Sequence, residues 1–194
     1  MNEIELIRRQ LAAERTHAGA VASACAAVGA RAAGKADGGR GAEFAQACVD
    51  YLVCVLAWFE ERDQRAGDLA HRLRPAETSA QRTLAEALAQ PGRSREALEK
   101  LERAVAADND AARRGDACGL WREFAHYFES VWSVRRETID ARLARSLRAL
   151  DWRAVAGIDA DSILEERRRY GRVRDALPAH VALPEAALPA PQSH

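Results

Sequence analysis

The chain has 194 residues, its 29 Lys and Arg are balanced by 29 Asp and Glu, and 48% of its residues are hydrophobic. This length suits one domain with a sizeable core, and the zero net charge excludes a polybasic nucleic-acid binder and an acidic-tail protein. Only Lys35 and Lys100 are lysines, and this preference for arginine is typical of a GC-rich bacterial genome. The longest apolar run, residues 51–59, is too short for a membrane span, and no secretory signal is visible.

Helix-forming residues dominate the chain from its first residues, and alternating β-branched segments are absent. The sequence therefore predicts an all-α protein. The expected long helices, each with one apolar stripe, cover residues 2–30, 43–73, 94–115 and 120–150. A shorter helix is expected at residues 77–89, and a last one from Ser162, where Ser162 and Glu165 form a capping-box pattern.

Long helices joined by Gly- or Pro-rich segments predict an antiparallel up-and-down four-helix bundle with one or two short extra helices. We expect the bundle to occupy residues 1–158, followed by a short C-terminal helix at residues 159–176. Residues 177–194 hold four of the six prolines, so we expect a flexible or loosely docked tail there.

The four cysteines form neither a CxxC pair nor a zinc-binding spacing. Each has Ala, Val or Gly as a neighbour, as expected of small, reduced thiols in the core of a cytoplasmic protein. The four are Cys25, Cys48, Cys54 and Cys118.

Polar residues on the apolar stripes are the candidate site residues, because bundles carry their chemistry on inward faces. Glu14 and His17 form a Glu-x-x-His pair, with the two side chains one turn apart on one helix. A buried unpaired carboxylate costs several kcal/mol, so acids near stripe centres indicate bound cations, and carboxylates with imidazole suit iron, manganese or zinc. The predicted metal ligands are Glu14, His17, Glu60, Asp63, Asp108 and Glu129.

Structural roles compete with this interpretation at each residue. Glu14 and Glu60 have arginines such as Arg62 and Arg65 within reach as ion-pair partners, and His17 alone is typical of a hydrogen-bonded boundary histidine. No Ser or Cys has a base on the same helix face, and neither GxSxG nor a phosphate-binding loop occurs. The sequence leaves open whether the protein is an enzyme, and it favours a protein that is not.

Three segments resemble the hemerythrin-like (HHE cation-binding) family: LAAERTHAGAVASAC, YLVCVLAWFEERDQRAGDL and VWSVRRETIDARLARSLRALDWRAVAGI. The resemblance covers residues 3–158 and implies a four-helix bundle with a non-haem di-iron site for oxygen binding or for iron or redox sensing. Only His17 matches a family ligand. Phe59 stands at the expected second-helix histidine, Asp63 keeps the acid, and residues 94–115 contain no histidine.

Two hypotheses follow from this partial match. The first is a degenerate family member whose carboxylate and His layer binds iron (di-iron or mononuclear) or manganese for sensing or redox chemistry. The second is a non-enzymatic interaction module without a metal, in which the buried acids pair with arginines and the surface binds a second copy or another protein. The arginines of residues 165–174 are offset by acids, so neither nucleic acid nor membrane is expected as a partner. The missing histidines favour the second hypothesis.

Overall fold

The computed structural model describes residues 3–32, 40–70, 96, 99–103, 114–128, 132, 136–137, 140–141, 149–179 and 181–183. Within these ranges the regular elements are helices, and no strand occurs. The helices are α1 (Glu3–Ala32), α2 (Arg40–Ala70), α5 (Arg114–Tyr127), α7 (Ala149–Ala156) and α8 (Ala160–Asp175). The all-α prediction is confirmed, whereas the expected helix at residues 77–89 lies outside the described residues.

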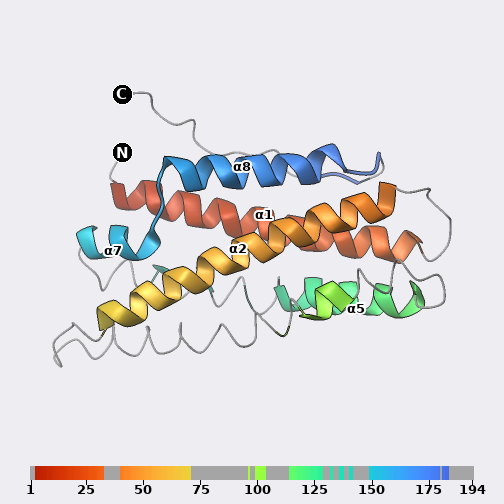
Figure 1. The fold of residues 1–194 in the computed structure, drawn as a ribbon, viewed down its shortest axis with the longest axis horizontal. Coiled ribbons are helices and arrows are strands. Elements are labelled where there is room, and N and C mark those ends of the chain that lie inside the picture. The colour runs from red at the N-terminus through yellow and green to blue at the C-terminus, as the bar shows by residue number, and fades with distance from the viewer. Residues whose placement is uncertain are drawn as a thin grey trace.

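The two longest helices form the centre of the molecule (Figure 1). α1 and α2 run in opposite directions and pack against each other. α8 lies along one side of this pair and contacts both helices, while α5 packs against α1 on the other side. α7 contacts α1 and α2, so α1 touches each of the other helices named above.

One apolar stripe on each long helix builds the core, because residues three and four apart share a helix face. On α1 the stripe includes Ile7, Leu11, Val21 and Cys25, and on α2 it includes Phe44, Cys48, Leu52, Leu56 and Phe59. Three aromatic side chains, those of Phe59, Phe128 and Trp132, pack closely within this core. Trp132 stacks on Phe128 with ring centroids 4.4 Å apart and meets Phe59 edge-on at 4.9 Å.

α8 begins at Ala160, inside the expected helical segment 159–176 but before Ser162, where the sequence predicted the helix to start. Asp159 is the N-cap, since its carboxylate accepts a hydrogen bond from the Ser162 backbone N–H and its own N–H donates to the Ser162 hydroxyl. The capping box therefore joins Asp159 to Ser162, and the predicted pairing of Ser162 with Glu165 was wrong. Glu165 instead binds Arg168 and Arg169 within the helix.

α5 also differs from the prediction, which ended one helix near Gly115 and began the next at residue 120. The structure continues the helix from Arg114 through Gly115 and Gly119. A glycine costs only about 1 kcal/mol in a helix interior, and burial of Trp121 and Phe124 in the core offsets such a cost. Further on, α7 extends to Ala156, beyond the predicted helix end at residue 150.

The turn between α7 and α8 requires a glycine. Gly157 has a φ of 54°, in the left-handed region that side chains with a Cβ disfavour. Its N–H donates to the Arg153 carbonyl at 3.1 Å. A Cβ on Gly157 would lie 1.6 Å from Nη1 of Arg65, but this is the end of a flexible side chain that is 42% exposed, so the backbone conformation is what requires the glycine.

The chain beyond α8 stays in contact with the bundle at its start. Leu177, Val181 and Leu183 are partly buried against the core, so the first residues of the predicted tail at 177–194 are docked. Across the parts of the chain that the structure describes, no helix is long and apolar enough to cross a membrane.

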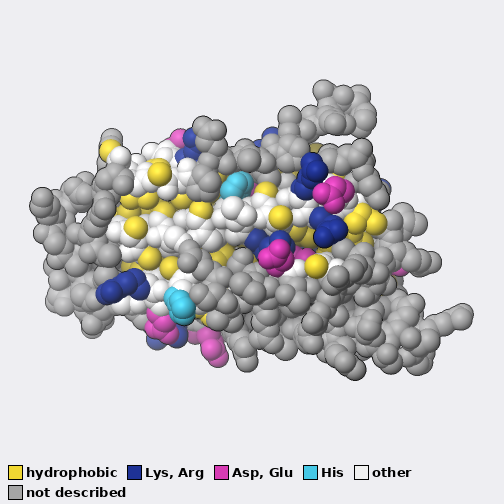
Figure 2. Space-filling view, turned by 180° about the vertical axis from the view of Figure 1, so that it is seen from behind, with side chains coloured by type: hydrophobic (Ala, Val, Ile, Leu, Met, Phe, Trp, Pro, Cys, Tyr) yellow, Lys and Arg dark blue, Asp and Glu magenta, His cyan; other side chains and the backbone are white. Residues whose placement is uncertain are grey.

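The described surface mixes charges of both signs. Figure 2 shows Lys and Arg side chains lying next to Asp and Glu side chains, with hydrophobic side chains between them.

Candidate functional site

Polar side chains are buried between the helices and form two groups, each held together by contacts among its own members. The first, here called the arginine layer, consists of Glu14, Arg15, Arg62, Asp63, Arg136 and Asp140. The second, the His17 cluster, consists of His17, Tyr51, Glu166 and Tyr170. All of these side chains are buried in the protein except that of Arg15, which is partly exposed.

Arg62 and Glu14 form the best-satisfied pair of the arginine layer. Arg62 donates through Nη1 to Glu14 Oε2 at 2.6 Å and through Nη2 to Oε1 at 3.3 Å. Its Nε donates to the Ala156 carbonyl at 2.8 Å, and Gln10 donates to Glu14 Oε1 at 3.2 Å. Arg62 therefore compensates the buried charge of Glu14 and links α1, α2 and α7.

Arg136 holds two carboxylates in the other half of this layer. It donates through Nη1 to Asp63 and through Nε to Asp140 Oδ1 at 3.0 Å, and Arg15 donates to Asp140 Oδ2 at 2.7 Å. Burial, together with a smaller effect of the charge of Asp140, outweighs the opposing effect of Arg136 and raises the pKa of Asp63 to about 6. Burial alone would lower the pKa of Arg136, but Asp140 and Asp63 raise it.

Phe59 connects the two halves of the arginine layer. The Cζ atoms of Arg62 and Arg136 each lie 4.8 Å from the centroid of its ring. Such cation–π contacts are worth about 2 kcal/mol when the cation is desolvated. Phe59 occupies the position at which the hemerythrin-like family would have a histidine. Its ring contacts two arginine side chains, which fits an arginine layer better than a metal site.

The His17 cluster is held together by contacts to the Glu166 carboxylate and by ring stacking. Oε1 of Glu166 lies 2.9 Å from Nδ1 of His17 and accepts a hydrogen bond from the Tyr51 hydroxyl at 2.7 Å. The His17 ring stacks on Tyr170 with centroids 4.2 Å apart. Burial and the charge of Glu166 raise the pKa of Tyr51, so this hydroxyl stays a donor. Oε2 of Glu166 is buried and has no hydrogen-bond partner in the described residues.

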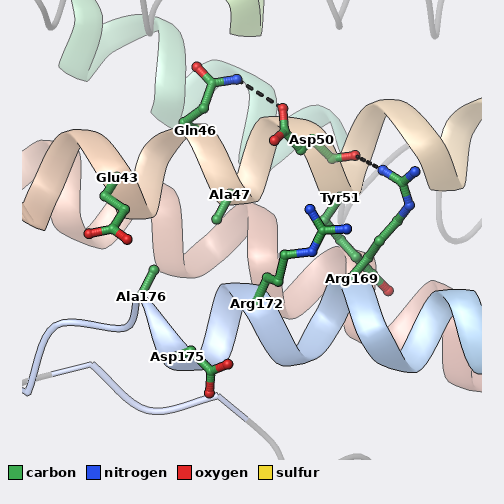
Figure 3. Close-up of a pocket in the computed structure, with 9 residues that line it drawn as sticks. All are labelled: Glu43, Gln46, Ala47, Asp50, Tyr51, Arg169, Arg172, Asp175 and Ala176. Atoms are coloured by element: carbon green, nitrogen blue, oxygen red, sulfur yellow. Dashed lines mark hydrogen bonds between the residues drawn. The ribbon is translucent and has the colours of Figure 1, made fainter.

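A cleft of about 440 Å³ lies between α2 and α8, beside the His17 cluster. Tyr51 forms part of its wall, and Arg169 and Arg172 reach into it from α8 (Figure 3). Gln46 donates to Asp50 Oδ1 at 2.9 Å, and Arg169 donates to the Asp50 carbonyl at 3.4 Å. We call it the α2–α8 cleft, and its remaining lining residues are Glu43, Ala47, Asp175 and Ala176.

The predicted metal ligands are distributed over different environments. Glu14 and Asp63 lie in the arginine layer, and His17 lies in its own cluster. Glu60 is half-buried on α2, with no hydrogen bond or ion pair to another described residue. Asp108 and Glu129 lie outside the described residues.

These donors are a poor fit to a metal ion in the arrangement observed. A metal at Glu14 would have to displace Arg62 and leave its charge buried, which is strongly unfavourable. Within the described ranges, no group of three or more His, Cys, Asp and Glu side chains is arranged to hold a metal ion. The alternative expectation, that the buried acids pair with arginines, is confirmed for Glu14 and Asp63.

The sequence analysis missed two of the four acids in these groups, Glu166 and Asp140, and it did not identify Arg136. It interpreted residues 165–174 as a solvated or partner-facing helix because of their arginines, yet Glu166, Tyr170 and Val173 form one buried face of α8. The spacing of these three residues was the available signal.

No protein-family model matches the chain, and neither a curated protein nor a solved structure is significantly similar to it. The resemblance to the hemerythrin-like family therefore stays a prediction, and the fold class rests on the helices themselves.

Proposed function

We propose that the protein is a non-enzymatic helical interaction module built on an up-and-down four-helix bundle. The opposite directions of α1 and α2, and the packing of α5 on α1, support this architecture. The observation that carries the function is that Glu14 and Asp63 are each bonded to a buried arginine. The arginine layer then stabilises the packing of the helices, and recognition is left to the surface.

The simplest partner is a second copy of the chain, bound through the outer face of α8. Leu164 on this face is 55% exposed, more than the other exposed large hydrophobic side chains in the described residues. Beside it, Glu165 binds Arg168 and Arg169, whose hydrogen bonds lower the pKa of Glu165 to about 2. A face that combines an apolar residue with charges of both signs suits a two-fold interface, in which acids of one copy meet arginines of the other.

The competing proposal is a hemerythrin-like iron or manganese site for sensing or redox chemistry. One observation favours it: Glu14 and His17 are both buried and lie one turn apart on α1. Its ligands would be the six predicted residues, which are Glu14, His17, Glu60, Asp63, Asp108 and Glu129.

Metal uptake separates the two proposals. Untagged protein would be stripped with EDTA, incubated anaerobically with Fe(II) or Mn(II), desalted and subjected to elemental analysis. We expect far less than one metal ion per chain. Near-stoichiometric metal that is lost in His17→Ala and kept in His126→Ala, a change at an exposed histidine of α5, would establish the metal site instead.

Self-association is tested by analytical ultracentrifugation over a range of micromolar concentrations. We expect a dimer for the natural chain and for Leu6→Glu, a control at a 36% exposed leucine of α1. Leu164→Glu should shift the equilibrium to monomer. A natural chain that stays monomeric throughout would reject self-association.

A further inference from the structure

The α2–α8 cleft carries opposite charges towards its two ends. Arg169 and Arg172 extend into the part lined by Tyr51 and Asp50, whereas Glu43 lies towards Ala176 (Figure 3). The guanidinium of Arg172 and the carboxylate of Glu43 have no hydrogen bond or ion pair with another described residue. Both side chains are exposed, so each can meet a ligand from solvent.

The arginine end is suited to a carboxylate. Arg169 is compensated by Glu165, which accepts from its Nε at 2.6 Å, and one of its Nη atoms makes only the long contact to the Asp50 carbonyl. Arg172 on the same helix has no such counter-charge among the residues that the structure describes. A carboxylate between the two guanidinium groups would receive planar, charge-assisted hydrogen bonds and relieve their mutual repulsion.

The opposite end is suited to an ammonium group. Glu43 lies in the first turn of α2, and Asp175 lines the cleft from the last turn of α8. Both side chains are exposed acids. Glu43 and Asp175 would repel a ligand with only negative charge, such as a phosphate, at this end.

Small apolar surfaces complete the lining between these charges. The partly exposed Ala47 and Ala176 offer contact to a short methylene chain. The volume of about 440 Å³ lies within the range of about 300–1,000 Å³ typical of small-molecule sites.

We propose that the α2–α8 cleft binds a small zwitterion, an amino acid or ω-amino carboxylate. Its carboxylate lies between Arg169 and Arg172, and its ammonium group faces Glu43. This inference goes beyond the proposed interaction module and does not depend on self-association, because Leu164 does not line the cleft.

Isothermal titration calorimetry tests the ligand class with a series of probes. Glycine, β-alanine, 4-aminobutyrate and 6-aminohexanoate are compared with butyrate and butylammonium, which each carry one of the two charges. We expect one zwitterion of the series to bind at least about tenfold more tightly than either singly charged probe, about 1.4 kcal/mol. Equal affinity for the best zwitterion and butyrate, or no binding of any zwitterion, would overturn the proposal.

Matched variants test the site. Arg172→Gln should weaken binding of the best zwitterion about tenfold or more, as expected for loss of a charge pair. Glu43→Gln should weaken zwitterion binding and should not weaken butyrate binding, because Glu43 repels an anion. Arg174→Gln, at an exposed arginine of α8 outside the cleft, should change neither.

Equal losses in Arg172→Gln and Arg174→Gln would show a general charge effect and reject the site. The Leu164→Glu chain should bind the zwitterion like the natural chain, which distinguishes a failure of this inference from a failure of self-association.

Discussion

The arginine layer and the His17 cluster each bury a glutamate completely, yet they stabilise it in different ways. Glu14 and Glu166 are both 0% exposed. Glu14 is bonded to the cation of Arg62, whereas Oε1 of Glu166 meets the His17 ring and the Tyr51 hydroxyl, and its Oε2 has no partner in the described residues. A buried acid can thus be stabilised either by a cation or by hydrogen bonds from polar groups. The two environments should respond differently when a charge is removed.

Removing one partner of the compensated pair should have the largest effect. Glu14→Gln leaves the cation of Arg62 buried without a counter-charge, and Arg62→Met does the same to Glu14. Each change should lower the free energy of unfolding by about 3–5 kcal/mol, measured by urea denaturation.

An exposed pair provides the control for this prediction. Arg9 and Glu5 form an ion pair whose side chains are 58% and 45% exposed, so Arg9→Gln should cost no more than about 1 kcal/mol. An Arg62→Met variant as stable as Arg9→Gln would mean that Glu14 does not rely on Arg62.

The pH dependence at Asp63 should be the next largest effect. Because burial raises the pKa of Asp63 from 3.8 to about 6, the folded chain binds more protons at this residue than the unfolded chain does between these values. The Asp63 contribution to stability therefore rises as the pH falls through this window. When the pH is lowered from 7 to 4, the free energy of unfolding of the natural chain should rise by up to about 3 kcal/mol relative to that of Asp63→Asn.

Urea denaturation at several pH values measures this difference. Asp50→Asn, at an exposed acid of α2, serves as the control and should show a much flatter difference curve. A natural chain that loses stability relative to Asp63→Asn as the pH falls would show that Arg136 keeps Asp63 ionised.

The smallest effects are expected in the His17 cluster. Glu166→Gln keeps an oxygen acceptor for Tyr51 and His17 and leaves no buried arginine without a counter-charge. Tyr51→Phe removes one hydroxyl donor. Each should cost about 1 kcal/mol in the same denaturation experiment. If Glu166→Gln proved as damaging as Glu14→Gln, the two environments would be energetically equivalent and the comparison would fail.

The parts of this molecule that the sequence predicted depend on local periodicity. The apolar stripes of α1 and α2, and the burial of Glu14 and Asp63 on them, follow from spacings of three and four residues. The partner of Asp63 could not be predicted from such spacings, because Arg136 lies 73 residues away in the sequence and reaches Asp63 only through the packing of the helices. Glu166 was missed for another reason: the many arginines of α8 make its sequence look polar throughout, so the spacing of its buried residues was overlooked.

The bond between His17 and Glu166 also has a consequence for the order of events in the cell. The two residues are 149 positions apart, so a ribosome adding about 5–20 residues per second needs roughly 7 to 30 s to pass from the first to the second. During that interval α1 presents a histidine whose buried partner does not yet exist. Completion of the His17 cluster is therefore a late step of synthesis, and the nascent chain cannot close this part of its interior before α8 has been made.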